Sequence, residues 1–73
     1  DENKMKQQIY DYAQERLELK EYDEAYELFQ ALARRGYSDS AVRMKDVVYA
    51  YAQDEMSQGE YQTALDTLLF LTD

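Results

Sequence analysis

The side chains that could do chemistry in this chain are almost all carboxylates and hydroxyls. The chain has no His, which removes the commonest general base and metal ligand, and no Cys, which removes disulfides. Sixteen of the 73 residues are Asp or Glu, so acidic pairs such as Asp23-Glu24 and Asp54-Glu55 arise by chance. We interpret these pairs as solvated helix faces, and none has the spacing of a calcium-binding loop.

Two serine hydroxyls, those of Ser38 and Ser40, lie in the one evident loop. Neither has a His to activate it as a nucleophile, and a short side-chain oxygen suits a helix cap, so capping is the better interpretation. Met5, Met44 and Met56 follow helical spacing and are interpreted as core or groove residues. The sequence therefore predicts no catalytic residue, no cofactor and no metal, and the chain is not expected to be an enzyme.

The charge balance restricts the partners. The formal net charge is −8, and such a surface repels phosphate, so neither nucleic acid nor an anionic membrane is an expected partner. No apolar run approaches the ~20 residues that a membrane helix needs. The first four residues lack the basic and apolar regions of a signal peptide, and the sequence assigns no compartment.

Apolar residues recur three and four positions apart, which predicts helices over about 3–19, 22–34, 41–58 and 60–72. The turns before the second and fourth helices are very short, so each helix should run antiparallel to its neighbour. The expected core-facing stripes are Met5, Ile9, Tyr12, Ala13, Arg16 and Leu19; Tyr22, Ala25, Tyr26, Phe29, Leu32 and Ala33; Met44, Val48, Tyr51, Ala52 and Glu55; and Tyr61, Ala64, Leu65, Leu68, Leu69 and Leu71.

The segment from Glu21 to Ala25 reappears 39 residues later, from Glu60 to Ala64. The same shift superimposes Met5 on Met44, Lys6 on Lys45, Tyr10 on Tyr49, Tyr12 on Tyr51, Ala13 on Ala52, Gln14 on Gln53 and Leu32 on Leu71. A fixed period of this size predicts stacked repeats. The predicted fold is all-α and a single domain, with one helix hairpin over about 3–40 stacked on a second over about 41–73.

At these positions the chain resembles the tetratricopeptide repeat. The family's small residue on the first helix corresponds to Ala13 and Ala52, and the large apolar residue before it to Tyr12 and Tyr51. Its G-x-Y turn corresponds to Gly59-Glu60-Tyr61 and, with Lys in place of Gly, to Lys20-Glu21-Tyr22. Its packing positions on the second helix correspond to Ala25 and Ala64, Phe29 and Leu68, and Leu32 and Leu71. The resemblance implies a fragment of a right-handed α-solenoid, with a period of 39 instead of the family's 34 and no closing Pro. The G-Y-S-D-S loop is similar to divergent repeats of large bacterial proteins, which suggests a bacterial source.

The resemblance also implies a site. In such repeats the first helix of each hairpin lines a concave groove, and the groove positions here would be Lys6, Tyr10, Gln14, Leu17, Lys45, Tyr49, Gln53 and Met56. Tyr offers contact area at low entropy cost, Gln can bond a peptide backbone, and isolated Lys residues could attract a carboxylate. The plainer interpretation is that these positions recur through duplication alone and that Tyr10 and Tyr49 pack between helices.

The predicted function is a protein- or peptide-interaction module, one part of a longer array, which binds through this groove. Two alternatives stay open. In the first, the repeats form a structural spacer without a ligand. In the second, they self-associate through exposed ends, because stacked repeats usually need about three units and this chain has two. Phe70 is the candidate self-association residue, since it lies off the main stripe at the register of Ala31, a position expected to be buried.

Overall fold

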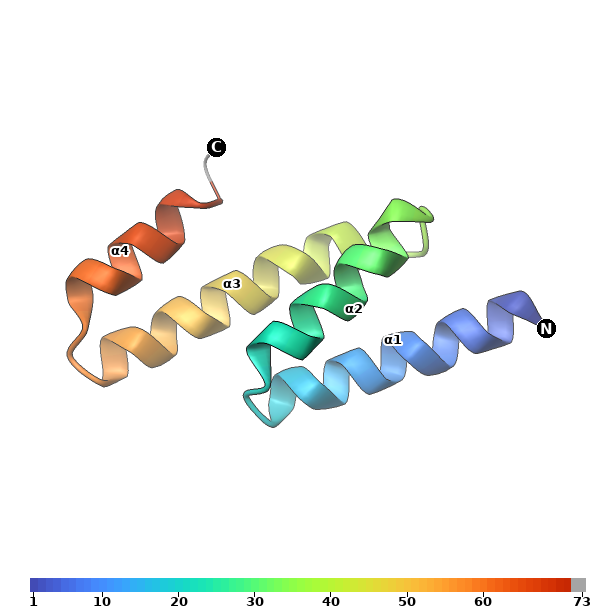
Figure 1. Ribbon diagram of the computed structural model, residues 1–73, viewed down its shortest axis with the longest axis horizontal. Coiled ribbons are helices and arrows are strands. Elements are labelled where there is room, and N and C mark those ends of the chain that lie inside the picture. Colours follow the sequence, from blue (N-terminus) through green and yellow to red (C-terminus); the bar gives the residue numbers. More distant parts are fainter. Residues whose placement is uncertain (72–73) are drawn as a thin grey trace.

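The computed structural model describes residues 1–71, which form four helices joined by short turns (Figure 1). Their bounds are α1 Glu2–Glu18, α2 Tyr22–Arg34, α3 Ser40–Ser57 and α4 Tyr61–Leu69. Helices that follow one another along the chain pack together, so α2 lies between α1 and α3, and α3 lies between α2 and α4. The all-α prediction is confirmed for the described residues, which contain no strand.

The two hairpin turns have the same backbone geometry. Lys20, in the turn after α1, has φ 63°, and Gly59, in the turn after α3, has φ 81°. In each turn the next amide donates to the carbonyl five residues earlier, at 2.8 Å in the first turn and 2.9 Å in the second. A left-handed residue followed by this bond closes the end of a helix tightly and returns the chain antiparallel.

Alanines set the distance between the helices of each hairpin. Ala13 of α1 and Ala25 of α2 are fully buried, and their counterparts Ala52 of α3 and Ala64 of α4 are nearly so. Because a methyl group is the whole side chain, the two backbones can approach closely at these points.

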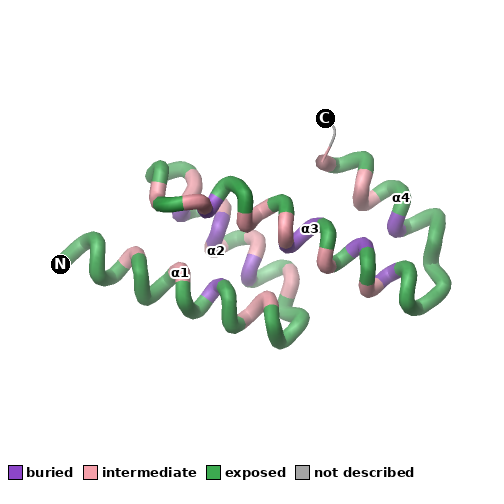
Figure 2. Tube along the Cα trace, turned by 180° about the vertical axis from the view of Figure 1, so that it is seen from behind, coloured by how far each residue is buried: buried purple, intermediate pink, exposed green. Residues whose placement is uncertain are grey.

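The larger core residues gather on α2 and α3 (Figure 2). Phe29 and Leu32 of α2 and Val47 of α3 are buried together with the first alanine pair. The ring of Tyr10, on α1, meets Phe29 edge-on with the centroids 5.4 Å apart. Burying a side chain such as Phe29 is worth about 1.5–3 kcal/mol, so this cluster is a main source of stability.

The outer helices differ from the expected stripes. On α1, Met5, Ile9 and Leu19 are exposed, whereas Tyr10 and Leu17, which were expected to face a groove, pack against the core. The physical reason is that α2 is the main packing neighbour of α1, so one narrow face is covered: Tyr10, Ala13 and Leu17, spaced three and four apart.

The fourth helix is also shorter and more exposed than expected. Tyr61 and Leu65 are exposed although both were expected in the core. The helix ends at Leu69 because the amides of Phe70 and Leu71 bond to carbonyls three residues back, which forms a turn instead of another helical step. The last part of the predicted helix, Thr72, and the final residue of the chain lie outside the described residues.

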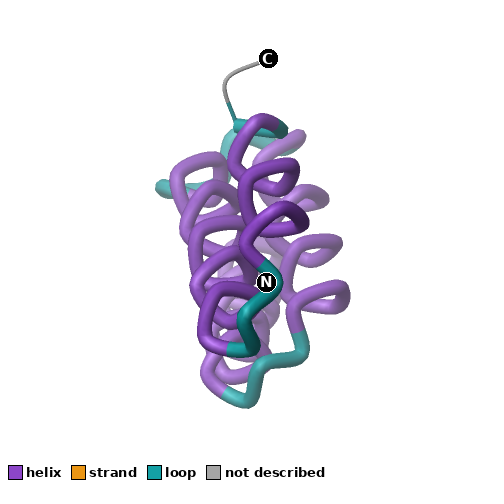
Figure 3. The backbone as a smooth tube through the Cα atoms, turned by 90° about the vertical axis from the view of Figure 1, so that its left-hand side faces the viewer, coloured by secondary structure: helices purple, strands orange, loops and turns teal. Residues whose placement is uncertain are grey.

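The whole arrangement is a thin slab with Cα extents of 45 × 26 × 13 Å, and Figure 3 shows it from one end. A slab this thin encloses little volume. Half of the buried apolar side chains among residues 1–71 are alanines, while large apolar side chains remain exposed on every helix but α2. None of the described helices is long and apolar enough to cross a bilayer.

The turn geometry makes a direct prediction about stability. Gly59→Ala should lower the free energy of unfolding by about 1 kcal/mol, because L-residues are strained at positive φ. A Cβ at this position would meet no other atom within 4 Å, so the cost comes from the backbone alone. Lys20→Gly should have the opposite sign and raise stability by about 0.5 kcal/mol, since Lys20 already bears this strain.

Urea unfolding followed by circular dichroism would measure both changes. Gln58→Ala is the matched control, because Gln58 precedes Gly59 in the same turn but has φ −93°. A Gly59→Ala variant as stable as the Gln58→Ala control would show that the left-handed turn does not exist in solution.

Candidate functional site

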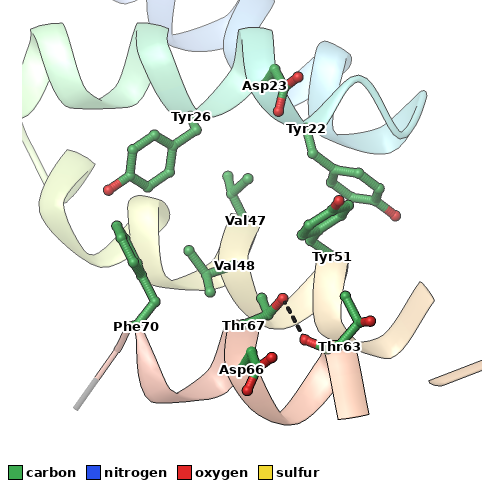
Figure 4. Close-up of a pocket in the computed structure, with 10 residues that line it drawn as sticks. All are labelled: Tyr22, Asp23, Tyr26, Val47, Val48, Tyr51, Thr63, Asp66, Thr67 and Phe70. Carbon is green, nitrogen blue, oxygen red and sulfur yellow. Dashed lines mark hydrogen bonds between the residues drawn. The ribbon is translucent and has the colours of Figure 1, made fainter. Parts of the chain in front are cut away.

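A cleft of about 430 Å³ opens between α2 and α4, with α3 as its floor (Figure 4). The residues that line it come from three helices and from the turn that follows α4. They are Tyr22, Asp23, Tyr26, Val47, Val48, Tyr51, Thr63, Asp66, Thr67 and Phe70.

The floor and the two ends of the cleft are apolar. Val47 and Val48 point up from α3 between the two walls. At one end Tyr22 and Tyr51 lie with their ring centroids 5.3 Å apart. At the other end Tyr26 faces the ring of Phe70 at 6.4 Å, and Phe70 is 64 % exposed. The cleft can therefore take a flat or branched apolar group between two pairs of aromatic rings.

The α4 wall is more polar. The Thr67 hydroxyl lies 2.6 Å from Oε1 of Glu55, a carboxyl group on α3 that is 5 % exposed, and 3.0 Å from the carbonyl oxygen of Thr63. A buried carboxyl oxygen without a donor would be costly, so the contact with Thr67 stabilises α4 against α3 in one position.

Two carboxylates give the cleft its charge. Asp23 stands on the α2 side and Asp66 on the α4 side. Asp66 accepts a hydrogen bond from the Gln62 amide at 3.4 Å, and within residues 1–71 neither carboxylate has a cation at salt-bridge distance. Burial, followed by the negative charge of Asp54, raises the pKa of Tyr22 above its usual value near 10. The site is thus an apolar cleft with an unneutralised acidic rim.

The residues predicted to form a groove are not brought together in this cleft. Tyr10 and Leu17 are half-buried against the core, and Lys6 is paired with Glu2 at 3.5 Å. The others are exposed on α1 and α3: Gln14, Lys45, Tyr49, Gln53 and Met56. Among the described residues, α1 and α3 do not pack along each other, and the two helices are bridged near the loop before α3.

That bridge is a hydrogen-bonded cluster. The Tyr10 hydroxyl donates to Asp39 Oδ1, and Arg43 donates from Nε to Asp39 Oδ2 at 3.1 Å, while its Nη2 lies in an ion pair with the same oxygen at 3.1 Å. Asp39 does stand at the N-cap of α3, one of the three positions expected to cap that helix, but its side chain makes no capping bond because its oxygens face Tyr10 and Arg43. Ser40 is fully buried, and its hydroxyl has no hydrogen-bond partner within residues 1–71. Tyr37 reaches back to α1 and donates to Gln7.

Sequence reasoning missed much of the cleft. Val47 was not predicted as a core residue because the 39-residue shift pairs it with the polar Gln8. The sequence predicts Asp23 only as part of a solvated helix face and gives Asp66 no role. The interpretation of Asp54-Glu55 as a solvated helix face is wrong for Glu55, which is 5 % exposed. Its place in the apolar stripe was a usable signal, because a buried carboxyl group needs a polar partner, which is Thr67. Ala31, expected to be buried at the register of Phe70, is exposed instead.

Comparisons with protein-family models, with curated proteins and with solved structures found no match to this chain. The site must therefore be interpreted from its own geometry. Within residues 1–71 no group of three His, Cys, Asp or Glu side chains is placed to hold a metal ion.

The cluster around Asp39 predicts how stability changes with pH. The hydrogen bond from Tyr10, helped by Arg43, lowers the pKa of Asp39 below 3.8, so its contribution is present above that pH and is lost as the pH falls through the folded-state pKa. The hydrogen bond to Asp39, followed by burial, raises the pKa of Tyr10 above 10.0, so the contribution of the neutral phenol is present below pH 10 and is lost as the pH rises further.

Tyr10→Phe should therefore lower stability at neutral pH and flatten both the acid and the alkaline limbs of the stability profile. Tyr49→Phe is the matched control, because Tyr49 has the same register but is 55 % exposed and has no partner within residues 1–71. Chemical denaturation across the pH range would measure both variants. Identical profiles for the two would show that the Tyr10–Asp39 bond does not form.

Proposed function

We propose that this chain is a tetratricopeptide-like helical-repeat module that binds a protein partner. In this proposal a basic segment of the partner places a large apolar side chain in the cleft between α2 and α4. The single observation that carries the proposal is the combination found in that cleft: an apolar floor, aromatic ends and two unneutralised carboxylates at the rim.

The repeat interpretation is supported by features that recur at the same spacing. The turns at Lys20 and Gly59 share their geometry, and the buried alanine pairs occupy the same register in both hairpins. Recurrence of both the turn and the packing contact favours two copies of one hairpin over four unrelated helices.

The charge of the partner follows from the charge of the chain. With a net charge of −8, the surface attracts basic segments and repels acidic ones over about a Debye length, ~8 Å at physiological salt. At the rim, Lys or Arg side chains of the partner can reach Asp23 and Asp66 while its apolar residue fills the cleft. Each exposed charge pair is worth about 0.2–1 kcal/mol, so the apolar residue supplies most of the affinity.

The surface expected from the family resemblance is the second candidate site. It is favoured by the exposure of Tyr49, Gln53 and Met56 along one face of α3. It lacks the concave shape of the cleft, because Tyr10 and Leu17, its expected counterparts on α1, pack inward. The spacer alternative, with no ligand of its own, predicts that neither surface binds.

A designed amphipathic helical peptide with Phe and Leu on one face and Lys on the other is a suitable probe, labelled for fluorescence anisotropy. We expect it to bind, its Lys→Glu version not to bind, and its Phe→Ala version to bind at least about tenfold more weakly, as expected for loss of a buried aromatic anchor. Asp23→Asn combined with Asp66→Asn should weaken binding about three- to tenfold.

The matched control is Asp11→Asn with Glu15→Gln, which changes the net charge equally but on an exposed face of α1 away from the cleft. Equal weakening by the two double variants would reduce the effect to general charge and contradict the cleft. Loss of binding on Tyr49→Ala, with no effect of the Asp23 and Asp66 changes, would move the site to the face of α3.

A further inference from the structure

We infer that the chain associates end to end with a second copy of itself, with α1 of one copy packing on α4 of the next as α3 packs on α2 within one chain. This inference concerns the two open ends of the slab and does not depend on the ligand of the cleft. The α2–α3 interface within the chain is the template for the contact between copies. The 39-residue shift shows which residues of α4 and α1 correspond to those of α2 and α3.

Within the chain, α2 presents Tyr22, Tyr26 and Phe29 toward α3. Tyr22 meets Tyr51 of α3 at a centroid distance of 5.3 Å, and Phe29 shares the buried core with Val47. These contacts bury Phe29 and leave Tyr22 and Tyr26 half-buried.

The same three positions on α4 are Tyr61, Leu65 and Leu68. Tyr61 is 66 % exposed and Leu65 is 53 % exposed, while Leu68 is half-buried. Among the described helices α3 is the main packing neighbour of α4, and Tyr61 and Leu65 on its α2-like docking face stay exposed.

The matching face lies at the other end of the slab. Met5, Ile9 and Tyr12 of α1 hold the register of Met44, Val48 and Tyr51 of α3, the residues by which α3 faces α2 and the cleft. Met5 is 61 % exposed and Ile9 40 %. Beside them a hollow of about 560 Å³ between α1 and α2 reaches Leu28 and Ala31.

The two ends are therefore different surfaces that complement each other through a contact the chain already makes once. In the associated pair, Tyr61 of one copy would meet Tyr12 of the second copy as Tyr22 meets Tyr51. A contact between two different patches is heterologous, so each added copy leaves one end of each kind open, and association extends linearly.

Two features set the strength of this contact. Each copy carries a net charge of −8, so like-charge repulsion opposes association and added salt should strengthen it. Gln8 occupies the register of Val47, which is 2 % exposed in the internal interface, so the intermolecular contact has a polar residue at its centre and is weaker than the template.

Sedimentation velocity over micromolar to millimolar concentrations tests the inference. The average mass should rise with concentration and with salt, in contrast to binding of a basic peptide, which salt weakens. Gln8→Val should tighten association about tenfold, as expected for replacing a buried amide with an apolar side chain. Leu65→Glu and Ile9→Glu should each leave monomers, and Val42→Glu is the control, since Val42 is exposed outside both faces.

Mixing the two blocked variants gives the decisive result. The Leu65→Glu copy keeps its α1 face and the Ile9→Glu copy keeps its α4 face, so the mixture should form a dimer that stops at two copies. Circular dichroism confirms that each variant is folded. A monomer at every concentration and salt, or a mixture that stays monomeric, would overturn the inference. Dimers of the unmodified chain that never extend would also overturn it, because they indicate a symmetric contact.

Discussion

The enclosure of Phe29 is the contact on which the rest of this structure depends. The ring meets Tyr10 of α1 on one side and shares the core with Val47 of α3 on the other, so one side chain of α2 contributes to packing on both neighbours. Since consecutive helices make the main packing contacts among the described helices, α2 is what joins the first hairpin to the second. The position of α3, and with it the floor of the cleft, follows from this cluster.

The cleft and the open ends have one cause, which is that the slab is only 13 Å deep between Cα atoms along its shortest axis. In a single layer of helices, every helix keeps at least one face exposed to solvent. The outer helices α1 and α4 keep most of their surface exposed. Apolar side chains on those faces are therefore exposed by geometry and not by the composition of the chain. Where the outward faces of α2 and α4 converge over α3 they form the cleft, and at the α1 end the exposed apolar side chains lie beside a second hollow between α1 and α2.

Local patterns in the sequence predicted those features of the fold that local interactions determine. On α2, Ala25, Phe29 and Leu32 are buried as expected because α2 packs between α1 and α3, whereas Tyr22 and Tyr26 of the same stripe are half-buried beside the cleft. The α1 stripe was wrong at Met5 and Ile9, since periodicity locates an apolar face but does not say whether a neighbour covers it. The cleft could not be found from spacing, because its walls come from α2 and α4, which are far apart in the chain, and because its rim carboxylates resemble any other acidic residue on this surface.

The unequal attachment of α1 and α4 has a mechanical consequence. Tyr10 and Tyr37 link α1 to the loop before α3, and Lys20 reaches Asp54 on α3 at 3.6 Å, so the first three helices are cross-linked beyond their core contacts. The nine-residue α4 packs on α3, and the Thr67–Glu55 contact and the buried Ala64 lie between these two helices. A pulling force applied to the two ends of the chain should therefore detach α4 first, at low force, and extend the remaining three helices in a single later step at higher force.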